Sequence, residues 1–457
     1  MTDQQPTEPA EPEPAEPESA DGAATETATD AGRSRSALGR RGFLAAVGLG
    51  TGAAAALGAG VAVAVESGGS SGSQNESGTM PFWGTHQQGV TNTPQEQTYF
   101  AAFDLLTEKR SDVEDLLRTW TQQAAELTAG NPAVSTAQRP TAPPVDTGES
   151  LDLGPAQLTL TFGFGATLFT KDGTDRYGLA ARRPAALVNL PVFHGDQLNA
   201  ATTGGDLTIQ ACASDPQIAF HAVRQLARAA AGVAQIRWVQ AGFNQAAKTK
   251  GTVRNLMGFK DGTANPPTSS ATQMNQYVWA GSDGPSWMVG GTYLVARLIR
   301  ISLEHWDTMS LNTQEAVIGR HKVSGAPLGG TREADPMDFT ARNSDGTATI
   351  PLNSHIRLSS PAMNGGAQML RRSYSYNNGV SPFVERWPPW KQALEYDAGL
   401  LFCCYQNDPR TAFVRIFERL ALSDAMNQFT THTGSILVAV PPAAAGPGHW
   451  IGEQLFA

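Results

Sequence analysis

A single carboxylate, Asp261, stands between two glycines in the segment Met257–Pro266 and is the first side chain whose setting suggests chemistry. A carboxylate in such a loop can accept a proton from a substrate and return it to another atom. The same segment also fits an ordinary tight turn, because Asp-Gly and Asn-Pro pairs are frequent in turns. Spacing within this segment alone leaves both interpretations open.

A histidine followed by a pair of arginines forms a second candidate group further along the chain. His355 lies in a mostly apolar run, and Arg371 and Arg372 begin the segment Arg-Arg-Ser-Tyr-Ser-Tyr. An imidazole can bind a metal through one nitrogen, and a guanidinium keeps its positive charge at any working pH. A lone histidine in an apolar run is also a common core residue, so the order of the segments matters more than any one of them.

Taken together, the Asp-Gly loop, the His-Ile-Arg run and the Arg-Arg-x-Tyr-x-Tyr run resemble, in that order, the dye-decolorizing (DyP-type) haem peroxidases. The resemblance extends from about Met80 to the C-terminus and is nearest to the subgroup with twin-arginine export signals, close to the deferrochelatase/peroxidase branch. Further matching stretches are Phe82–Gln87, Leu158–Gly165, Asp175–Leu179, Gly319–Lys322 and Gly325–Gly329.

The resemblance implies a role for each candidate side chain around a haem. His355 is expected to be the proximal iron ligand, Asp261 the distal acid-base group and Arg371 the distal cation. We prefer Arg371 to Arg372 because it holds the first position of the family's motif, and Arg372 on a strand would point to the opposite face. Asp397 is expected to accept a hydrogen bond from His355, although it could equally well turn the chain before a strand.

Two apolar residues, Leu400 and Phe402, alternate along a predicted strand and can share one face. The resemblance implies that they cover the distal haem, so that bulky donors would be oxidised at the surface through aromatic side chains. The candidates for this relay are Tyr374, Tyr376, Trp387 and Trp390, each of which could instead be a packing or surface residue.

The expected function is that of an exported haem b peroxidase that reduces hydrogen peroxide and oxidises dyes, phenols or similar donors through a ferryl intermediate. The haem is expected to be non-covalent, one per chain, because the sequence contains no Cys-x-x-Cys-His. Two alternatives remain open: a deferrochelatase-like protein that releases iron from haem, and a haem carrier without turnover.

An internal repeat predicts the fold without reference to any family. The segment Leu207–Phe220 aligns without a gap with Leu400–Phe413, and each reads as a buried strand that ends at Asp-Pro before a helix. Two similar α+β halves with antiparallel strands and peripheral helices follow from this pattern. The resemblance adds that both halves are ferredoxin-like, at residues 80–250 and 251–457, and that the haem lies in the second.

The first part of the chain has the composition of an export segment. Residues 1–32 are rich in Pro, Ala and Glu without an aromatic residue, which predicts a disordered acidic tail. Arg40 and Arg41 precede an apolar stretch of small residues, so residues 33–65 look like a twin-arginine signal peptide. A transmembrane anchor is the competing interpretation. Residues 66–79 form a Gly/Ser-rich linker.

These features predict export by the twin-arginine machinery to an extracytoplasmic location, with no stable membrane span in the mature form. The formal net charge of −9 argues against nucleic acid as a partner. The three cysteines, Cys212, Cys403 and Cys404, show neither a disulfide framework nor zinc spacing. The resemblance implies hydrogen peroxide and small aromatic or dye reductants as partners.

Overall fold

The computed structural model describes residues 78–132, 140–245, 251–381 and 395–457. Residues 1–77, with the predicted tail, the signal and nearly all of the linker, lie outside the described part, as do Trp387 and Trp390. No helix in the described ranges is long and apolar enough to cross a membrane.

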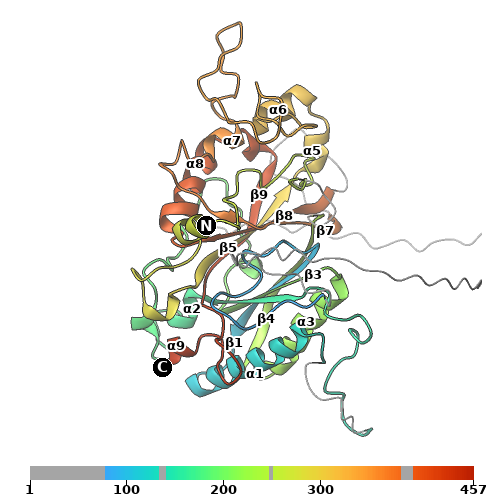
Figure 1. Ribbon diagram of the computed structural model, residues 1–457, viewed down its shortest axis with the longest axis vertical. Helices are drawn as coiled ribbons and strands as arrows, with labels where there is room; N and C mark the ends of the chain where they lie inside the picture. The colour runs from blue at the N-terminus through green and yellow to red at the C-terminus, as the bar shows by residue number, and fades with distance from the viewer. Residues whose placement is uncertain (1–77, 133–139, 246–250, 382–394) are drawn as a thin grey trace, which may run out of the picture. The chain divides into compact units, whose positions relative to one another are not determined.

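The first half has the strand order of a ferredoxin-like sheet. Its strands β1 (Gln97–Leu105), β2 (Thr159–Gly165), β3 (Leu207–Ala213) and β4 (Ala234–Phe243) are all antiparallel and lie in the order β4-β1-β3-β2. The two long helices of this half are α1 (Arg110–Thr128) and α3 (Pro216–Ala229), which lie side by side against the sheet (Figure 1).

The second half repeats this order. Its four long strands are β5 (Thr292–Ile301), β7 (Tyr374–Ser381), β8 (Glu395–Gln406) and β9 (Thr430–Val440), in the order β7-β8-β5-β9, with the short strand β6 (Leu370–Arg371) also paired with β8. The helices around them are α5 (Leu303–Asp307), α6 (Leu311–Ile318), α7 (His355–Leu358) and α8 (Arg415–Ser423). The predicted duplication of two ferredoxin-like halves is confirmed.

The repeat that predicted this duplication corresponds to equivalent elements. Strand β3 leads to Asp215, whose carboxylate accepts hydrogen bonds from the first backbone N–H groups of α3. Strand β8 leads to Asp408, which accepts from the backbone N–H of Arg410 at 2.9 Å. A π-helical turn, Arg410–Val414, then continues into α8. Asp215 thus caps α3, and Asp408 binds the first turn of the helical segment that continues into α8.

The two sheets also meet at both edges, which the sequence did not predict. Strand β2 pairs with β9, at Phe164 and Ala439 among others, and β4 pairs with β7 at Phe243 and Ser375. Because β5 also pairs with β8, eight of the nine strands described form a closed ring. Side chains alternate across each strand, so the ring has an inner face and an outer face.

On strand β8, alternate side chains face the inside and the outside of the ring. Leu401, Cys403 and Tyr405 are fully buried and pack with the inner apolar cluster of the ring. Leu400 and Phe402 alternate with Leu401 and Cys403 along the strand and face the opposite side, where they line a cavity next to α7 and α8. The inner face therefore supports the fold, while the outer face of the second half is open to a ligand.

Trp120 of α1 anchors the covered face of the first half. Its side chain is 1% exposed, packs 5.2 Å from the ring of Phe103 and donates a hydrogen bond to the carbonyl of Leu226 at 2.7 Å. Trp120→Ala should lower the free energy of unfolding by about 3–5 kcal/mol, measured by urea titration. The control Val192→Ala, at a side chain 84% exposed, should change it by less than about 0.5 kcal/mol, and equal midpoints for both variants would contradict this packing account.

Candidate functional site

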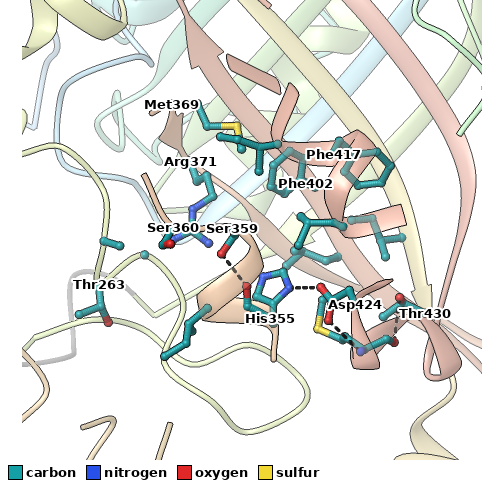
Figure 2. A pocket seen from close by; sticks show the side chains of 18 of the residues that line it. Thr263, His355, Ser359, Ser360, Met369, Arg371, Phe402, Phe417, Asp424 and Thr430 are labelled. Carbon is teal, nitrogen blue, oxygen red and sulfur yellow. Dashed lines mark hydrogen bonds and ion pairs between the residues drawn. The ribbon is translucent and has the colours of Figure 1, made fainter. Parts of the chain in front are cut away.

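A large cavity lies between the outer face of the second sheet and the helices α7 and α8. It encloses about 1190 Å³ of empty space, including the part open to solvent. Most of its exposed wall area is apolar, and many polar and charged side chains also line it, a combination that suits a cofactor with polar groups. The residues that line it include His355, Asp424, Arg371, Gly262, Leu400 and Phe402, several of which are labelled in Figure 2.

His355 lies at the first position of α7, and its side chain points into this cavity. Its Nδ1 is 2.6 Å from Oδ2 of Asp424, so the ring is held in one orientation (Figure 2). Asp424 is buried and follows α8, where its second oxygen accepts the backbone N–H of Met426 at 2.9 Å. With Nδ1 bound in this way, Nε2 is left on the side of the ring turned away from Asp424.

Burial by itself lowers the pKa of the His355 imidazole. The negative charge of Asp424 and its hydrogen bond act in the opposite direction and outweigh burial, so the pKa is raised above its ordinary value. A carboxylate that accepts from one imidazole nitrogen also makes the other nitrogen a stronger electron donor. The pair is thus prepared to bind a metal ion through Nε2.

The prediction that Asp397 accepts from His355 is wrong, because Asp424 occupies that role. Asp397 lies an odd number of residues from Leu400 on β8, so its side chain points to the opposite face of the strand. Its carboxylate accepts a hydrogen bond from Asn378 at 3.1 Å instead. The same alternation that directs Leu400 into the cavity therefore excludes Asp397 from it.

Asp261 lies in a loop whose backbone requires glycine on both sides. Gly258 and Gly262 have φ values of +84° and +114°, which other residues rarely adopt. A side chain at position 258 would also meet Lys322. The segment is thus a turn, as one interpretation held, and it also presents the Asp261 carboxylate to Arg371, with Oδ1 at 2.8 Å from Nη1.

Of the two neighbouring arginines, Arg371 is the one that lines the cavity. Arg372 is buried on the other face, where its guanidinium donates to the carbonyl of Asn92 at 2.5 Å and to the side chain of Gln95 at 2.6 Å. In Figure 2 the side chain of Arg371 lies above that of His355, and both line the cavity. The site therefore has an ion pair on one side and an oriented imidazole on the other.

The proposed relay tyrosines are both buried. Tyr374 is completely buried and Tyr376 is 2% exposed, and both lie on β7 next to β8. Nothing in these positions tests whether the two tyrosines carry electrons, so their relay role stays a prediction. The same hypothesis for Trp387 and Trp390 concerns residues outside the described ranges.

The cavity fits a haem by the chemistry of its residues. Two histidines, His355 and His432, line the cavity, and a buried carboxylate orients the ring of His355 so that one nitrogen is left for the iron. A porphyrin supplies the remaining ligands itself. The walls include Ile299, Leu400, Phe402, Ile416 and Phe417, which suit a flat apolar ring system.

Comparison with known proteins shows which family this chain belongs to. Residues 87–244 match the family model described as "Dyp-type peroxidase, N-terminal", and residues 252–445 match "Dyp-type peroxidase, C-terminal". A deferrochelatase of Escherichia coli K12 is 36% identical over 385 residues, which cover 82% of this chain and 87% of that protein.

Solved structures agree with this match. Ferric DtpA from Streptomyces lividans is 39% identical, with a TM-score of 0.74 over 83% of this chain and 98% of that one. A DyP-type peroxidase from Cellulomonas bogoriensis is 37% identical, with a TM-score of 0.72 over 83% and 98% of the two chains. With the two halves, the cavity and these matches in agreement, the chain belongs to the Dyp-type peroxidase family, a family of haem-dependent enzymes.

Proposed function

We propose that this protein is an exported haem b peroxidase that reduces hydrogen peroxide and oxidises small aromatic donors such as dyes and phenols. The observation that carries the proposal is the Asp261–Arg371 ion pair, which lies beside the same cavity as the His355–Asp424 pair. The Asp261–Arg371 pair can act on a peroxide, and the His355–Asp424 pair can hold an iron.

His355 would hold the haem iron through Nε2, with Asp424 fixing the ring. When bound, haem supplies the oxidation and reduction chemistry: it takes up the oxidising equivalents of peroxide and passes them to donors. Leu400 and Phe402 would pack against the distal face and exclude large molecules from it. Bulky donors would therefore react at the protein surface, and Tyr374 and Tyr376 are candidates for the electron path.

Asp261 would move the proton that peroxide cleavage requires. Its carboxylate can accept a proton from the inner oxygen of peroxide and deliver it to the outer oxygen, which then leaves as water. Arg371 would stabilise the negative charge that develops on the departing oxygen, because its guanidinium is already positioned and charged. The ion pair also holds the carboxylate beside the guanidinium, with Oδ1 of Asp261 2.8 Å from Nη1 of Arg371.

A second cavity gives peroxide a route to Asp261. It encloses about 1050 Å³ including its open part, and polar residues such as Thr252, Asn265 and Ser373 line it. Asp261 lines this cavity, His355 lines the first one, and Arg371, Gly262 and Leu400 line both. We infer that a small polar oxidant enters through the second cavity and meets the ion pair at the junction.

Turnover with donors tests this function against its alternatives. The purified holoprotein, supplied with hydrogen peroxide and a phenol or an anthraquinone dye, should consume both in a haem-dependent reaction. A second candidate is iron release, since the E. coli relative is named deferrochelatase. Appearance of metal-free porphyrin fluorescence without donor oxidation would favour that candidate, and neither reaction would favour a haem carrier.

Export remains a proposal that rests on the sequence. Arg40 and Arg41 followed by an apolar stretch support a twin-arginine signal within residues 33–65. That route carries folded cargo, which suits an enzyme that receives its haem inside the cell. Replacing both arginines by lysine should retain the protein in the cytoplasm, measured by fractionation, and unchanged export would contradict the twin-arginine route.

Asp424→Asn should weaken the hold on haem while leaving the cavity intact. The amide oxygen can still accept from Nδ1 of His355, but the negative charge is lost and Nε2 becomes a poorer donor. We expect haem to dissociate about 10- to 100-fold faster, measured by transfer to an excess of apomyoglobin. Asp408→Asn, a cap at the other end of the same helical segment, serves as the control and should leave the rate unchanged.

A further inference from the structure

Backbone hydrogen bonds shape the loop that carries Asp261, and side chains from other segments add to them. Gly258 and Gly262 flank it, and glycine has access to more backbone conformations than any other residue. The Asp261 backbone makes a hydrogen bond from its N–H to the carbonyl of Val253 at 2.9 Å. The side chain of Asp261 lies 2.8 Å from Arg371, and side-chain contacts with Thr263 and Asn265 also hold the loop in place.

Glu333, from a distant loop, binds the residues on both sides of the Asp261-Gly262 pair. One of its carboxylate oxygens accepts a hydrogen bond from the Thr263 hydroxyl at 3.0 Å, and the other forms an ion pair with the ammonium of Lys260. The side chains of Lys260 and Glu333 are only 15% and 20% exposed, so solvent screens the pair less than it would screen a surface pair.

Contacts with neighbouring residues favour the charged form of Glu333 and hold its backbone. Burial alone would raise the pKa of its carboxyl, but hydrogen bonds from Lys260, Thr252 and Thr263 and the charge of Lys260 lower it below its ordinary value. Arg320 is buried and donates to the backbone carbonyl of Glu333 at 3.0 Å. Glu333 is therefore a charged group on a fixed backbone.

Asn265 holds the other side of the loop against the strand that bears Arg371. Its amide nitrogen donates to the carbonyl of Arg371 at 2.7 Å, and its amide oxygen accepts the N–H of Arg371 at 3.1 Å. The loop is thus attached to β6 at Asn265 and to the Glu333 loop at Lys260 and Thr263. Asp261 lies between these attachments.

We propose that Glu333 is a positioning residue that sets the Asp261 carboxylate against Arg371 by clamping Lys260 and Thr263. The proposal rests on the proposed function, because it concerns the speed at which Asp261 serves the peroxide reaction. Glu333 itself touches neither the haem site's imidazole nor the Asp261 carboxylate in any contact that the described residues make. Small displacements of a catalytic group cost much rate, so its effect should be large.

The first test compares three variants of the haem-loaded protein by stopped-flow mixing with hydrogen peroxide. Glu333→Ala should slow the change in the Soret band by about 10- to 100-fold. Glu333→Gln, which can still accept from Lys260 and donate to Thr263, should recover most of the rate. Asp335→Ala removes a carboxylate from the same loop, whose hydrogen bonds within the described part of the chain are with Thr331 and Arg332, and it should change the rate by less than about twofold.

The second test asks whether Glu333 acts through Asp261. In an Asp261→Asn background, Glu333→Ala should cause no further loss of rate, because the group that it positions is already gone. If the rate losses of Asp261→Asn and Glu333→Ala multiply in the double variant, the proposal is overturned and Glu333 has a general structural role. Haem content and thermal midpoint, measured for each variant, should stay close to those of the wild type.

Failure of the inference differs from failure of the proposed function. If the wild-type protein does not react with peroxide, the proposed function is wrong. If the wild type reacts and Glu333→Ala reacts equally fast, only the positioning role of Glu333 is wrong. If Glu333→Ala does not fold, Thr263→Val removes one arm of the clamp with little change of shape. It should slow the reaction several-fold, again without effect in the Asp261→Asn background, and an unchanged rate would overturn the proposal.

Discussion

Replacing His355 by Ala should abolish stoichiometric haem binding while the protein remains folded. His355 is the imidazole in the cavity that a buried carboxylate holds at 2.6 Å, which leaves Nε2 for the iron. Loss of the ligand should weaken haem binding by more than about 100-fold, beyond the effect typical of a residue that only orients a ligand. Titration of the apoprotein with haemin, followed in the Soret band, measures this directly.

The matched control for this variant is His321→Ala. His321 binds Glu315 at 2.8 Å and lines a different cavity, so its loss should leave haem binding unchanged. Added imidazole should partly restore the Soret band of His355→Ala, because it can occupy the space of the lost ring. Full haem occupancy with an unchanged ligand spectrum in His355→Ala would mean that another residue holds the iron.

Asp261→Asn should slow the reaction with peroxide by about 10²- to 10⁴-fold without loss of haem. The amide has the shape of the carboxylate and can still accept from Arg371, but it cannot take up a proton near neutral pH. Stopped-flow mixing of the ferric protein with peroxide gives the rate constant. The variant therefore isolates proton transfer from the electrostatic role of Arg371.

A carboxylate elsewhere on the ring provides the control for Asp261. Asp397→Asn removes a carboxylate that binds Asn378 on the face of β8 opposite the cavity. Its reaction with peroxide should match that of the wild type. If Asp261→Asn reacts as fast as the wild type, the proton must move through another group, and the assignment of Asp261 is wrong.

Much of the fold followed from one repeat in the sequence. A buried strand that ends at Asp-Pro is a local pattern, and finding it twice in register predicted two similar halves. Closure of the ring had no such signal, because the edge strands meet through few residue pairs, such as Phe243 with Ser375. Pairing between edge strands depends on how whole sheets approach each other, and short local patterns do not record that.

The sequence predicted those site residues that lie in recognisable motifs. Asp261, His355 and Arg371 lie in distinctive segments, and the structure brings them to one cavity and its border. Asp397 was predicted wrongly although strand alternation, already applied to Leu400, could have excluded it. The information needed for that correction was therefore present in the sequence.

Two other residues could not have been found in this way. Asp424 ends a helix and caps the next turn, so nothing in its segment separates a capping Asp from the partner of a buried imidazole. Glu333 lies in a loop rich in charged residues, and its contacts with Lys260 and Thr263 join segments about seventy residues apart. Such long-range polar contacts are fixed by the tertiary structure and leave no local pattern.

The most direct test of the account is to mix the purified ferric protein with one equivalent of hydrogen peroxide and to follow the Soret and visible bands by stopped flow. We predict a rapid spectral change that a phenolic donor reverses and that Asp261→Asn slows. A haem spectrum that peroxide leaves unchanged would contradict the peroxidase assignment and would favour haem carriage or iron release.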